Sequence, residues 1–429
     1  MNMWPKNRHI NTVAVVATGL VAALGMAACG SSGSSTGSNS GTSASAKQTI
    51  VFATAGLGTE GTATKTAITG FEKAHPNITV NLLPLSSSST SAQQQEQNYF
   101  VAGSATPDVV YTDVTWPAAD VKAGWLANLS SFNPNTSNFF AGQMSTGQIN
   151  GGIYAIPWFI NAEGIYYRTD LIKSPPTSAS QLVSDAQAAM QADPSLKEGL
   201  AFEGDTYEGA VTAFQSFGGQ ITLSDLKKGI DTPANVQALT FMYDAIHTSK
   251  ISPSAVTSWE EPQVQSAWLS GQAPFALNWP YIYQLSEASG SPVANKTAWI
   301  PFPSSTPQTS LGGDDLAINA KSTHKAAAWE FIQYLTSDSV QDARAISAGD
   351  PPSVKSAYNS TLYAQAPYYK GEQAVYNAVV SRPVASNYAQ ISTQLQNMIA
   401  SVLSGQATPS AALATAAPTV KALADGASG

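Results

Sequence analysis

The sequence predicts an α/β fold arranged as two lobes. Strand-like and helical segments alternate along the chain, and residues 48–429 are too many for one small core. Hydrophobic residues make up 43% of the chain and aromatic residues 9%, which is enough apolar material for two packed cores.

The globular part opens with a β-α-β unit. Residues 49–53 are an apolar run typical of a strand, and apolar side chains then recur at helical spacing between Ala67 and Ala74. Pro76 ends this helix, and residues 78–83 are typical of the next strand. Such a unit favours a parallel sheet covered by helices.

The same alternation continues towards the C-terminus. Further strands are expected at residues 108–111, 153–156, 275–277 and 316–318, and amphipathic helices at 326–335 and 391–403. The second of these helices has the clearest pattern, with apolar side chains on one face at Ile391, Leu395, Met398, Ile399 and Val402. No internal repeat interrupts this order.

Residues 1–28 have the pattern of a secretion signal. Lys6 and Arg8 precede an apolar run, residues 13–24, that is too short to span a bilayer. The run leads into Met26-Ala27-Ala28-Cys29, which contains the single cysteine of the chain. This segment resembles the lipobox of bacterial lipoproteins, although Met26 stands where leucine is commonest. The alternatives are a plain signal peptide and a buried leader helix, each with an incidental cysteine.

The lipobox resemblance implies cleavage before Cys29 and a lipid on its thiol. Residues 29–47 are almost wholly Ser, Gly, Thr and Ala, a composition that predicts a flexible tether. The sequence therefore predicts an extracytoplasmic protein that its N-terminal lipid anchors to the outer face of the cytoplasmic membrane.

Charge and composition exclude several classes of function. The formal charge is −8, and removal of Lys6 and Arg8 with the signal changes it to −10. An acidic chain without a Lys/Arg cluster argues against nucleic acid as a partner. A single cysteine leaves no disulfide, and the scattered histidines provide no metal-ligand spacing, so neither a metal nor another cofactor is expected. The histidines are His9, His75, His247 and His324.

Seven segments in order along the chain carry a family resemblance. They are GFEKAHPNITVNLLPL (70–85), PDVVYTDVTWPAADVKAGWLANL (107–129), GGIYAIPWFINAEGIYYRTDLI (151–172), YEGAVTAFQSFGGQ (207–220), WLSGQAPFALNWPYIY (268–283), LGGDDLAINAKSTHKAAAWEFIQYLTS (311–337) and SRPVASNYAQIS (381–392). Together they resemble the family 1 extracellular solute-binding proteins of ABC sugar importers, most closely the trehalose/maltose-binding branch.

The resemblance implies a type II periplasmic-binding-protein clamp with a ligand cleft between the lobes and a hinge of several strands. The N-lobe would hold residues 48–158 and 312–343, and the C-lobe residues 159–311 and 344–429. The protein would capture a di- or oligosaccharide such as trehalose or maltose as a monomer and deliver it to ABC permease subunits in the membrane.

A sugar site needs aromatic rings for the C–H faces of the sugar and polar side chains for its hydroxyls. Trp279 follows an apolar strand in Asn278-Trp279-Pro280-Tyr281, and the resemblance places the sugar-stacking platform here, with Tyr281 beside it. Trp259 lies in a polar loop, which predicts an exposed ring. The alternatives are a core tryptophan at position 279 and a packing residue at a helix start for Trp259.

Four charged residues are candidates for binding hydroxyls. Asp113 follows an apolar strand, and ligands of open α/β sheets bind beyond strand ends, although Asp113 could instead cap the helix that begins near Pro117. The resemblance adds Glu60 in a glycine-rich loop, Glu208 in the YEG segment and Arg382 in the RPV segment. For Glu208 the alternative is a solvated helix start, and for Arg382 an ion pair between the lobes.

The hinge segments supply the remaining candidates. Asn161 stands where relatives carry an aspartate, so a mixed donor and acceptor replaces a carboxylate. Gly312 and Gly313 would allow the backbone to approach the sugar closely. Asp314 and Asp315 follow them, and their correspondence with the family is loose.

Three other functions remain open at this stage. The chain could bind another carbohydrate, a polyol or a glycerol phosphodiester, or it could be a lipoprotein that senses sugar without a permease. A secreted glycoside hydrolase would need two carboxylates across the bond, and Glu208 and Asp315 are conceivable for those roles.

Overall fold

The computed structural model describes residues 46–56, 58–86, 89–304 and 308–427, all within one compact unit. The predicted signal peptide, Cys29 and the tether up to residue 45 lie outside the described residues. Within these ranges, no helix combines the length and the apolar character that crossing a bilayer requires.

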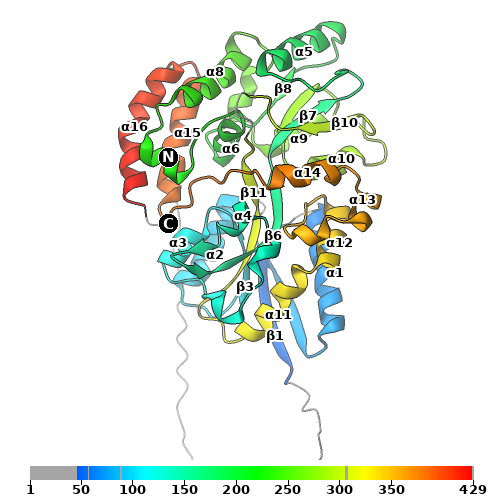
Figure 1. Cartoon of the computed structure of the whole chain (residues 1–429), viewed down its shortest axis with the longest axis vertical. Coiled ribbons are helices and arrows are strands. Elements are labelled where there is room, and N and C mark those ends of the chain that lie inside the picture. The colour runs from blue at the N-terminus through cyan, green and yellow to red at the C-terminus, as the bar shows by residue number, and fades with distance from the viewer. Residues whose placement is uncertain (1–45, 57, 87–88, 305–307, 428–429) are drawn as a thin grey trace, which may run out of the picture. The chain divides into compact units, whose positions relative to one another are not determined.

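A five-stranded sheet forms the core of the first lobe (Figure 1), with strand order β2-β1-β3-β11-β6. Its strands are β1 (Gln48–Thr54), β2 (Ile78–Pro84), β3 (Val109–Asp113), β6 (Ala155–Ala162) and β11 (Leu311–Ile318). β1 is parallel to β2 and β3, whereas β11 is antiparallel to β3 and β6. The predicted β-α-β opening is therefore confirmed.

A four-stranded sheet forms the core of the second lobe, with strand order β10-β7-β9-β8. Its strands are β7 (Gly164–Arg168), β8 (Leu200–Ala201), β9 (Phe275–Asn278) and β10 (Thr297–Ile300). Only Glu163 separates β6 from β7, so the chain passes from one sheet directly into the other. The exact residues at which the lobes divide stay predictions.

Helices cover both sheets. Those beside the first sheet are α1 (Gly58–Ala74), α2 (Ser89–Val101), α3 (Pro117–Lys122), α4 (Ala141–Met144), α11 (Lys325–Leu335) and α12 (Asp338–Ala348). Those beside the second are α5 (Ala179–Ala192), α6 (Glu208–Ser216), α7 (Leu223–Lys228), α8 (Pro233–His247), α9 (Glu261–Leu269), α10 (Tyr281–Ser286), α15 (Tyr388–Leu403) and α16 (Pro409–Asp425).

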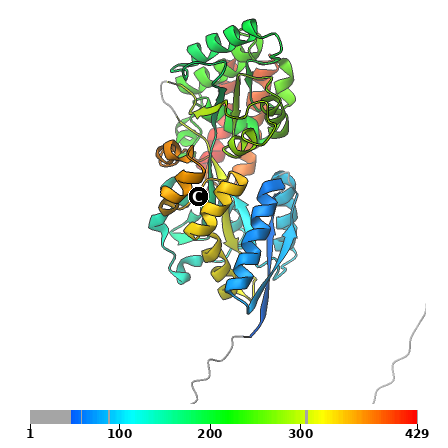
Figure 2. The same cartoon turned by 90° about the vertical axis from the view of Figure 1, so that its right-hand side faces the viewer.

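In Figure 2 the blue first elements and the green middle of the chain lie in different lobes, and the orange helices α13 (Ser360–Gln365) and α14 (Tyr369–Tyr376) lie where the lobes meet.

Short elements complete the structure. They are the hairpin of β4 (Gln148–Ile149) and β5 (Gly152–Ile153) and the 3-10 helices η1 (Leu129–Phe132), η2 (Thr136–Asn138), η3 (Ser254–Ser258) and η4 (Lys355–Ala357).

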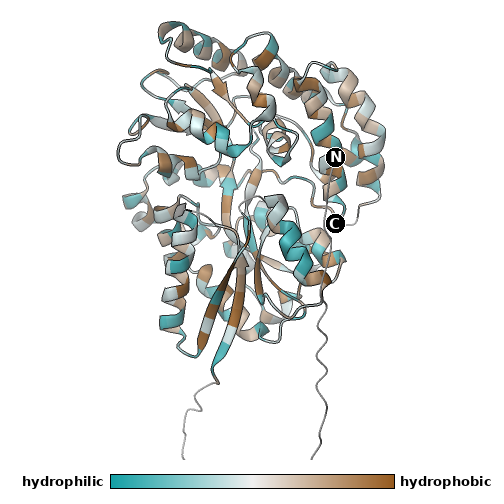
Figure 3. Cartoon of the chain, turned by 180° about the vertical axis from the view of Figure 1, so that it is seen from behind, coloured by the Kyte–Doolittle hydropathy of each residue, from teal (hydrophilic) through white to brown (hydrophobic). Residues whose placement is uncertain are grey.

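Each lobe has its own hydrophobic core, and the first-sheet strands carry long brown apolar stretches in Figure 3. In the first lobe the Phe52 ring packs edge-to-face on Trp158 at 5.7 Å and on Phe331 at 5.3 Å between centroids. In the second lobe the apolar stripe of α15 is buried, as its spacing predicts. A third cluster, which includes Phe140, Ile160, Leu311, Tyr369 and Tyr376, lies where the lobes meet.

One predicted strand is wrong as a single element. Residues 153–156 are divided between β5, which ends at Ile153, and β6, which begins at Ala155. β5 pairs with β4 in a hairpin, whereas β6 pairs with β11. Local hydrophobicity does not distinguish these partners, because pairing depends on residues distant in the sequence.

Arg344 of α12 links the first lobe to the following loop. Its guanidinium lies 4.2 Å above the Trp158 ring and 4.7 Å above the Phe159 ring, and it forms an ion pair of 2.7 Å with Asp350. Nη1 also donates to Thr64 Oγ1 of α1 at 3.1 Å. Because both charged groups are buried, each depends on the other for compensation.

We predict that Arg344→Met lowers the free energy of unfolding by about 3–5 kcal/mol, because it leaves a buried carboxylate without its cation. Urea denaturation of the soluble protein measures this effect. Lys421→Met is the matched control, since Lys421 and Asp425 form an exposed pair on α16 that solvent screens. Equal unfolding midpoints for the two variants would contradict the stabilising role of Arg344.

Candidate ligand-binding site

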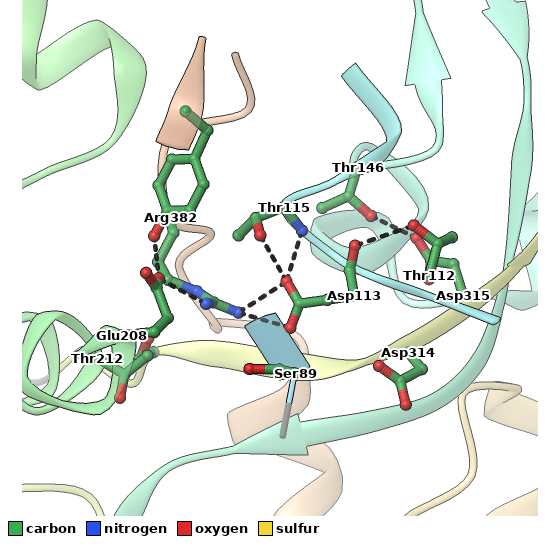
Figure 4. A network of polar contacts seen from close by, with 12 residues as sticks. Ser89, Thr112, Asp113, Thr115, Thr146, Glu208, Thr212, Asp314, Asp315 and Arg382 are labelled. Atoms are coloured by element: carbon green, nitrogen blue, oxygen red, sulfur yellow. Dashed lines mark hydrogen bonds and ion pairs between the residues drawn. The ribbon is translucent and has the colours of Figure 1, made fainter. Parts of the chain in front are cut away.

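Arg382 is the centre of a polar network between the lobes (Figure 4). Nη1 donates to Glu208 Oε1 at 2.7 Å, and Nη2 donates to both carboxylate oxygens of Asp113 at 3.3 Å. Asp113 ends β3 in the first lobe and Glu208 begins α6 in the second. Burial acts to lower the pKa of Arg382, but the surrounding acidic groups outweigh it and raise the pKa above its usual value.

Both carboxylates are held in place by further donors. The backbone N–H and hydroxyl of Thr115 donate to Asp113 Oδ1 at 2.8 and 2.6 Å, while α3 begins without a side-chain cap. The alternative of Asp113 as cap of that helix is therefore wrong. Glu208 accepts from Ser392 Oγ at 2.5 Å and from the Tyr388 hydroxyl, so it is not a solvated helix start. Arg382 does form the ion pair between the lobes that was the alternative to a sugar-binding role, and its partners are Asp113 and Glu208.

Trp279 follows β9 and belongs to none of the hydrophobic clusters among the described residues. Its half-buried ring lies over Gly312, where a Cβ would be 2.7 Å from the indole Cζ3. Only glycine at position 312 leaves room for this ring. The alternative of a core tryptophan does not fit this position.

The other hinge residues lie beside Trp279. Asn161 of β6 pairs with Gly312 of β11, and its buried Oδ1 has no hydrogen-bond partner within the described ranges. Gly313 has a φ of +95°, and a Cβ there would be 2.3 Å from the Phe159 carbonyl, so the backbone itself requires glycine. The free acceptor of Asn161 thus lies on the strand next to Gly312, the residue that the Trp279 ring covers.

Trp259 and Tyr281 are more deeply packed than the sequence suggests. The prediction of an exposed Trp259 ring is wrong: the residue is half-buried and packs against two clusters of the second lobe. Tyr281 begins α10, and its hydroxyl donates to Gln265 Oε1 at 3.3 Å. Burial and the nearby Glu261 raise the pKa of this hydroxyl.

Glu60 lies in the first turn of α1, near acidic groups of both lobes. Burial raises the pKa of its carboxyl to about 8, and repulsion from Asp350 and Glu261 adds to this effect while Arg344 opposes it. Tyr281 in turn experiences the charges of Glu261, Glu203 and Glu60. Carboxyl groups from α1 and α9 therefore gather around one tyrosine.

Sequence reasoning assigned no role to several buried carboxyls near this network. Burial raises the pKa of Glu203 and Asp314, and it raises that of Glu163 to about 8. Glu163 accepts from Ser216 Oγ at 2.6 Å and Thr212 Oγ1 at 3.4 Å. Glu203 follows β8, so the rule of polar residues beyond strand ends could have found it. Glu163 directly follows β6, so the same rule could have found it, whereas Asp314 lies within β11.

The arrangement is suited to a ligand with many hydroxyls. Carboxylates and Asn161 Oδ1 accept hydrogen bonds, the guanidinium donates them, and Trp279 offers a ring face. No cluster of metal-ligating side chains occurs in the described part of the chain. Two described cavities lie elsewhere, beside Trp299 and beside Trp329, and neither is lined by a predicted site residue.

A two-lobed α/β protein with polar and aromatic side chains from both lobes at their junction is a ligand-binding clamp. The sequence profile of the bacterial extracellular solute-binding proteins matches residues 55–342, so the chain belongs to that family. The two-lobe fold that the sequence predicts is thereby confirmed.

One protein known by its sequence and two solved structures illustrate what this chain is similar to. A probable ABC transporter-binding protein of Deinococcus radiodurans is 31% identical over 359 residues, which cover 79% of this chain and 84% of that protein. The structure of maltose-bound MalE3 of T. maritima matches with 32% identity and a TM-score of 0.79, covering 87% of this chain and 99% of the other. The GacH receptor of Streptomyces glaucescens has the same fold, with 23% identity, a TM-score of 0.79 and coverage of 89% and 99%.

We predict that Glu163→Gln stabilises the protein at pH 8 but not at pH 5. Because its folded pKa of about 8 exceeds the ordinary 4.5, folded Glu163 keeps a proton that the unfolded chain loses. Stability from this group is complete below pH 4.5 and falls as the pH rises towards 8. Glutamine keeps the acceptor for Ser216 without titrating, so the gain at pH 8 should be about 4 kcal/mol, at about 1.4 kcal/mol for each pKa unit between 4.5 and 8.

Urea denaturation at both pH values measures this difference. Glu287→Gln is the control, since Glu287 is exposed, accepts from the Asn295 N–H and forms no ion pair within the described ranges. A Glu163→Gln effect that is the same at pH 5 and pH 8 would show that the folded carboxyl has an ordinary pKa.

Proposed function

We propose that this protein captures a di- or oligosaccharide of the trehalose or maltose type between its lobes and delivers it to the permease subunits of an ABC importer. The observation that carries the proposal is the position of Arg382, which reaches Asp113 of one lobe and Glu208 of the other. The maltose bound to the T. maritima protein and the transporter role named for the D. radiodurans relative support it.

Each polar group would have a defined role towards a sugar. Asp113 and Glu208 would accept hydrogen bonds from hydroxyls, and Arg382 would donate to hydroxyl or ring oxygens. Asn161 Oδ1 is a further open acceptor. Trp279, with Tyr281 and Trp259 behind it, would stack on the apolar face of a sugar ring, while Gly312 and Gly313 keep the crossing strand close. Glu60 would form a hydrogen bond with a sugar hydroxyl from the first-lobe side.

A binding role fits these carboxyls better than hydrolysis does. Asp315, one of the two carboxylates conceivable for a glycoside hydrolase, is fully buried and accepts from Thr146 Oγ1 at 2.8 Å and Gln143 Nε2 at 3.1 Å. The other, Glu208, is occupied by Arg382, Tyr388 and Ser392. Asp315 is therefore not free to act at a glycosidic bond, which leaves Glu208 without the second carboxylate that hydrolysis requires.

The site is tested by a thermal-shift panel on wild type and Trp279→Ala, with trehalose, maltose, longer maltodextrins, sucrose, xylobiose and glycerol phosphate compounds. We expect one disaccharide class to raise the melting temperature of the wild type in a concentration-dependent way, since ligand binds only the folded protein. Trp279→Ala should abolish that rise and leave the unliganded melting temperature nearly unchanged, because Trp279 lies outside the core clusters.

Trp125→Ala is the control, since Trp125 stacks on Phe100 in the first lobe and is not among the residues proposed to bind sugar. It should retain the ligand-induced rise. Recovery of the sugar intact after incubation separates binding from hydrolysis. A wild type that responds to no sugar would refute the proposed ligand class, and an unfolded Trp279→Ala would show that Trp279 is a core residue after all.

The proposed anchor is a lipid on Cys29, with residues 29–47 as tether to a monomeric binding unit outside the membrane. We predict that Cys29→Ser moves the protein from the membrane fraction to the soluble fraction of cells without changing its sugar-induced melting shift. Immunoblots of the fractions measure this. A Cys29→Ser protein that stays with the membrane would contradict lipidation as the anchor.

A further inference from the structure

A cavity of about 370 Å³ lies in the second lobe between β10 and α14. It is lined by aromatic and apolar side chains and one carboxyl, including Tyr283, Thr297, Trp299, Tyr368, Glu372 and Val375. Its size is within the range of small-molecule sites in proteins. None of the residues proposed to bind sugar lines it.

Strand alternation places this cavity behind the sugar site. Ile160 and Ala162 of β6 belong to the cluster against which Trp299 and Tyr368 pack. Asn161 stands between them in the strand and therefore points to the opposite face. The cavity and Asn161 thus lie on different sides of β6, so a ligand of one site does not occupy the other.

The walls of the cavity are ring faces and hydrocarbon. The Tyr283 and Tyr368 rings stack with centroids 4.1 Å apart at 29°. Trp299 Nε1 is buried close to Gly164 and has no hydrogen-bond partner within the described ranges. Thr297 Oγ1 donates to the Val293 carbonyl at 3.2 Å. The cavity side chains therefore include no Arg, Lys, Asn or Gln donor.

Glu372 is the one acidic side chain that lines the cavity. It is only 6% exposed, and the Tyr376 hydroxyl donates to Oε2 at 2.5 Å. No basic side chain in the described ranges forms an ion pair with it. Burial raises the pKa of its carboxyl to about 7, which the Tyr376 hydrogen bond opposes. Burial therefore disfavours the charged form of this carboxyl, and a bound cation would favour it.

We propose that this cavity binds a small organic cation, an ammonium group with apolar substituents. Such a cation would pair with the Glu372 carboxylate while its substituents lie against the aromatic side chains of Tyr283, Tyr368 and Trp299, whose π-systems attract cations. A sugar would find one carboxyl and two tyrosine hydroxyls, too few polar groups for its several hydroxyls, and an anion would be repelled by Glu372. The proposal is independent of the sugar site.

Isothermal titration calorimetry of the purified protein with tetramethylammonium chloride tests this. The neutral isostere tert-butanol and sodium chloride at equal ionic strength are the matched ligands. We expect saturable binding of tetramethylammonium and at least tenfold weaker binding of tert-butanol, because only the cation gains from the carboxylate and the ring faces. Sodium chloride should give no binding.

Glu372→Gln keeps the shape and the acceptor for Tyr376 but removes the charge, and we expect it to weaken tetramethylammonium binding at least tenfold. Glu330→Gln, in the first lobe, should bind as wild type. Tyr283→Leu removes one half-buried ring and should weaken binding severalfold, which provides a second test if Glu372→Gln fails to fold. Absence of tetramethylammonium binding, equal affinity for tert-butanol, or unchanged affinity in the variants that fold would overturn the proposal.

Discussion

A buried guanidinium needs acidic partners, and Arg382 has one in each lobe. At 3% exposure it loses most of its hydration, and only the carboxylates of Asp113 and Glu208 compensate for that loss. Because those carboxylates belong to β3 and α6, the requirement of a single cation holds the end of one sheet against the first turn of a helix in the other lobe. Tyr388 and Ser392 of α15 extend the same network through Glu208.

This network also explains how the site can be polar and yet part of a folded protein. Acidic groups outnumber basic ones around the junction, and burial raises the pKa of Glu60, Glu163, Glu203 and Asp314. Protonation lowers the cost of burying these carboxyls, and hydroxyls such as Ser216 satisfy them. A ligand that brings its own hydroxyls adds donors where the protein has an excess of acceptors.

The alternation of side chains along the strand that crosses between the lobes determines which residues face the proposed sugar site and which face the cavity. Alternation along β6 points Asn161 towards Trp279 and Gly312, and points Ile160 and Ala162 towards the aromatic cluster. Asn161, with its free acceptor, therefore lies on one side of β6, and the tyrosine rings around Glu372 lie on the other side. Neighbouring side chains of β6 point to opposite faces. The proposed sugar site and the proposed cation site therefore lie on opposite sides of this strand, which joins the lobes.

The sequence by itself determined the local elements, because their periodicity is a property of neighbouring residues. The opening β1-α1-β2 unit and the apolar stripe of α15 are where their spacing predicts. The family resemblance supplied Arg382 and Trp279 as candidates. Only the tertiary structure decided their surroundings: Arg382 pairs with residues 174 and 269 positions away, and Trp259 is packed rather than exposed. The Glu372 cavity has no signal in the sequence, since its walls come from elements that meet only after both sheets have formed.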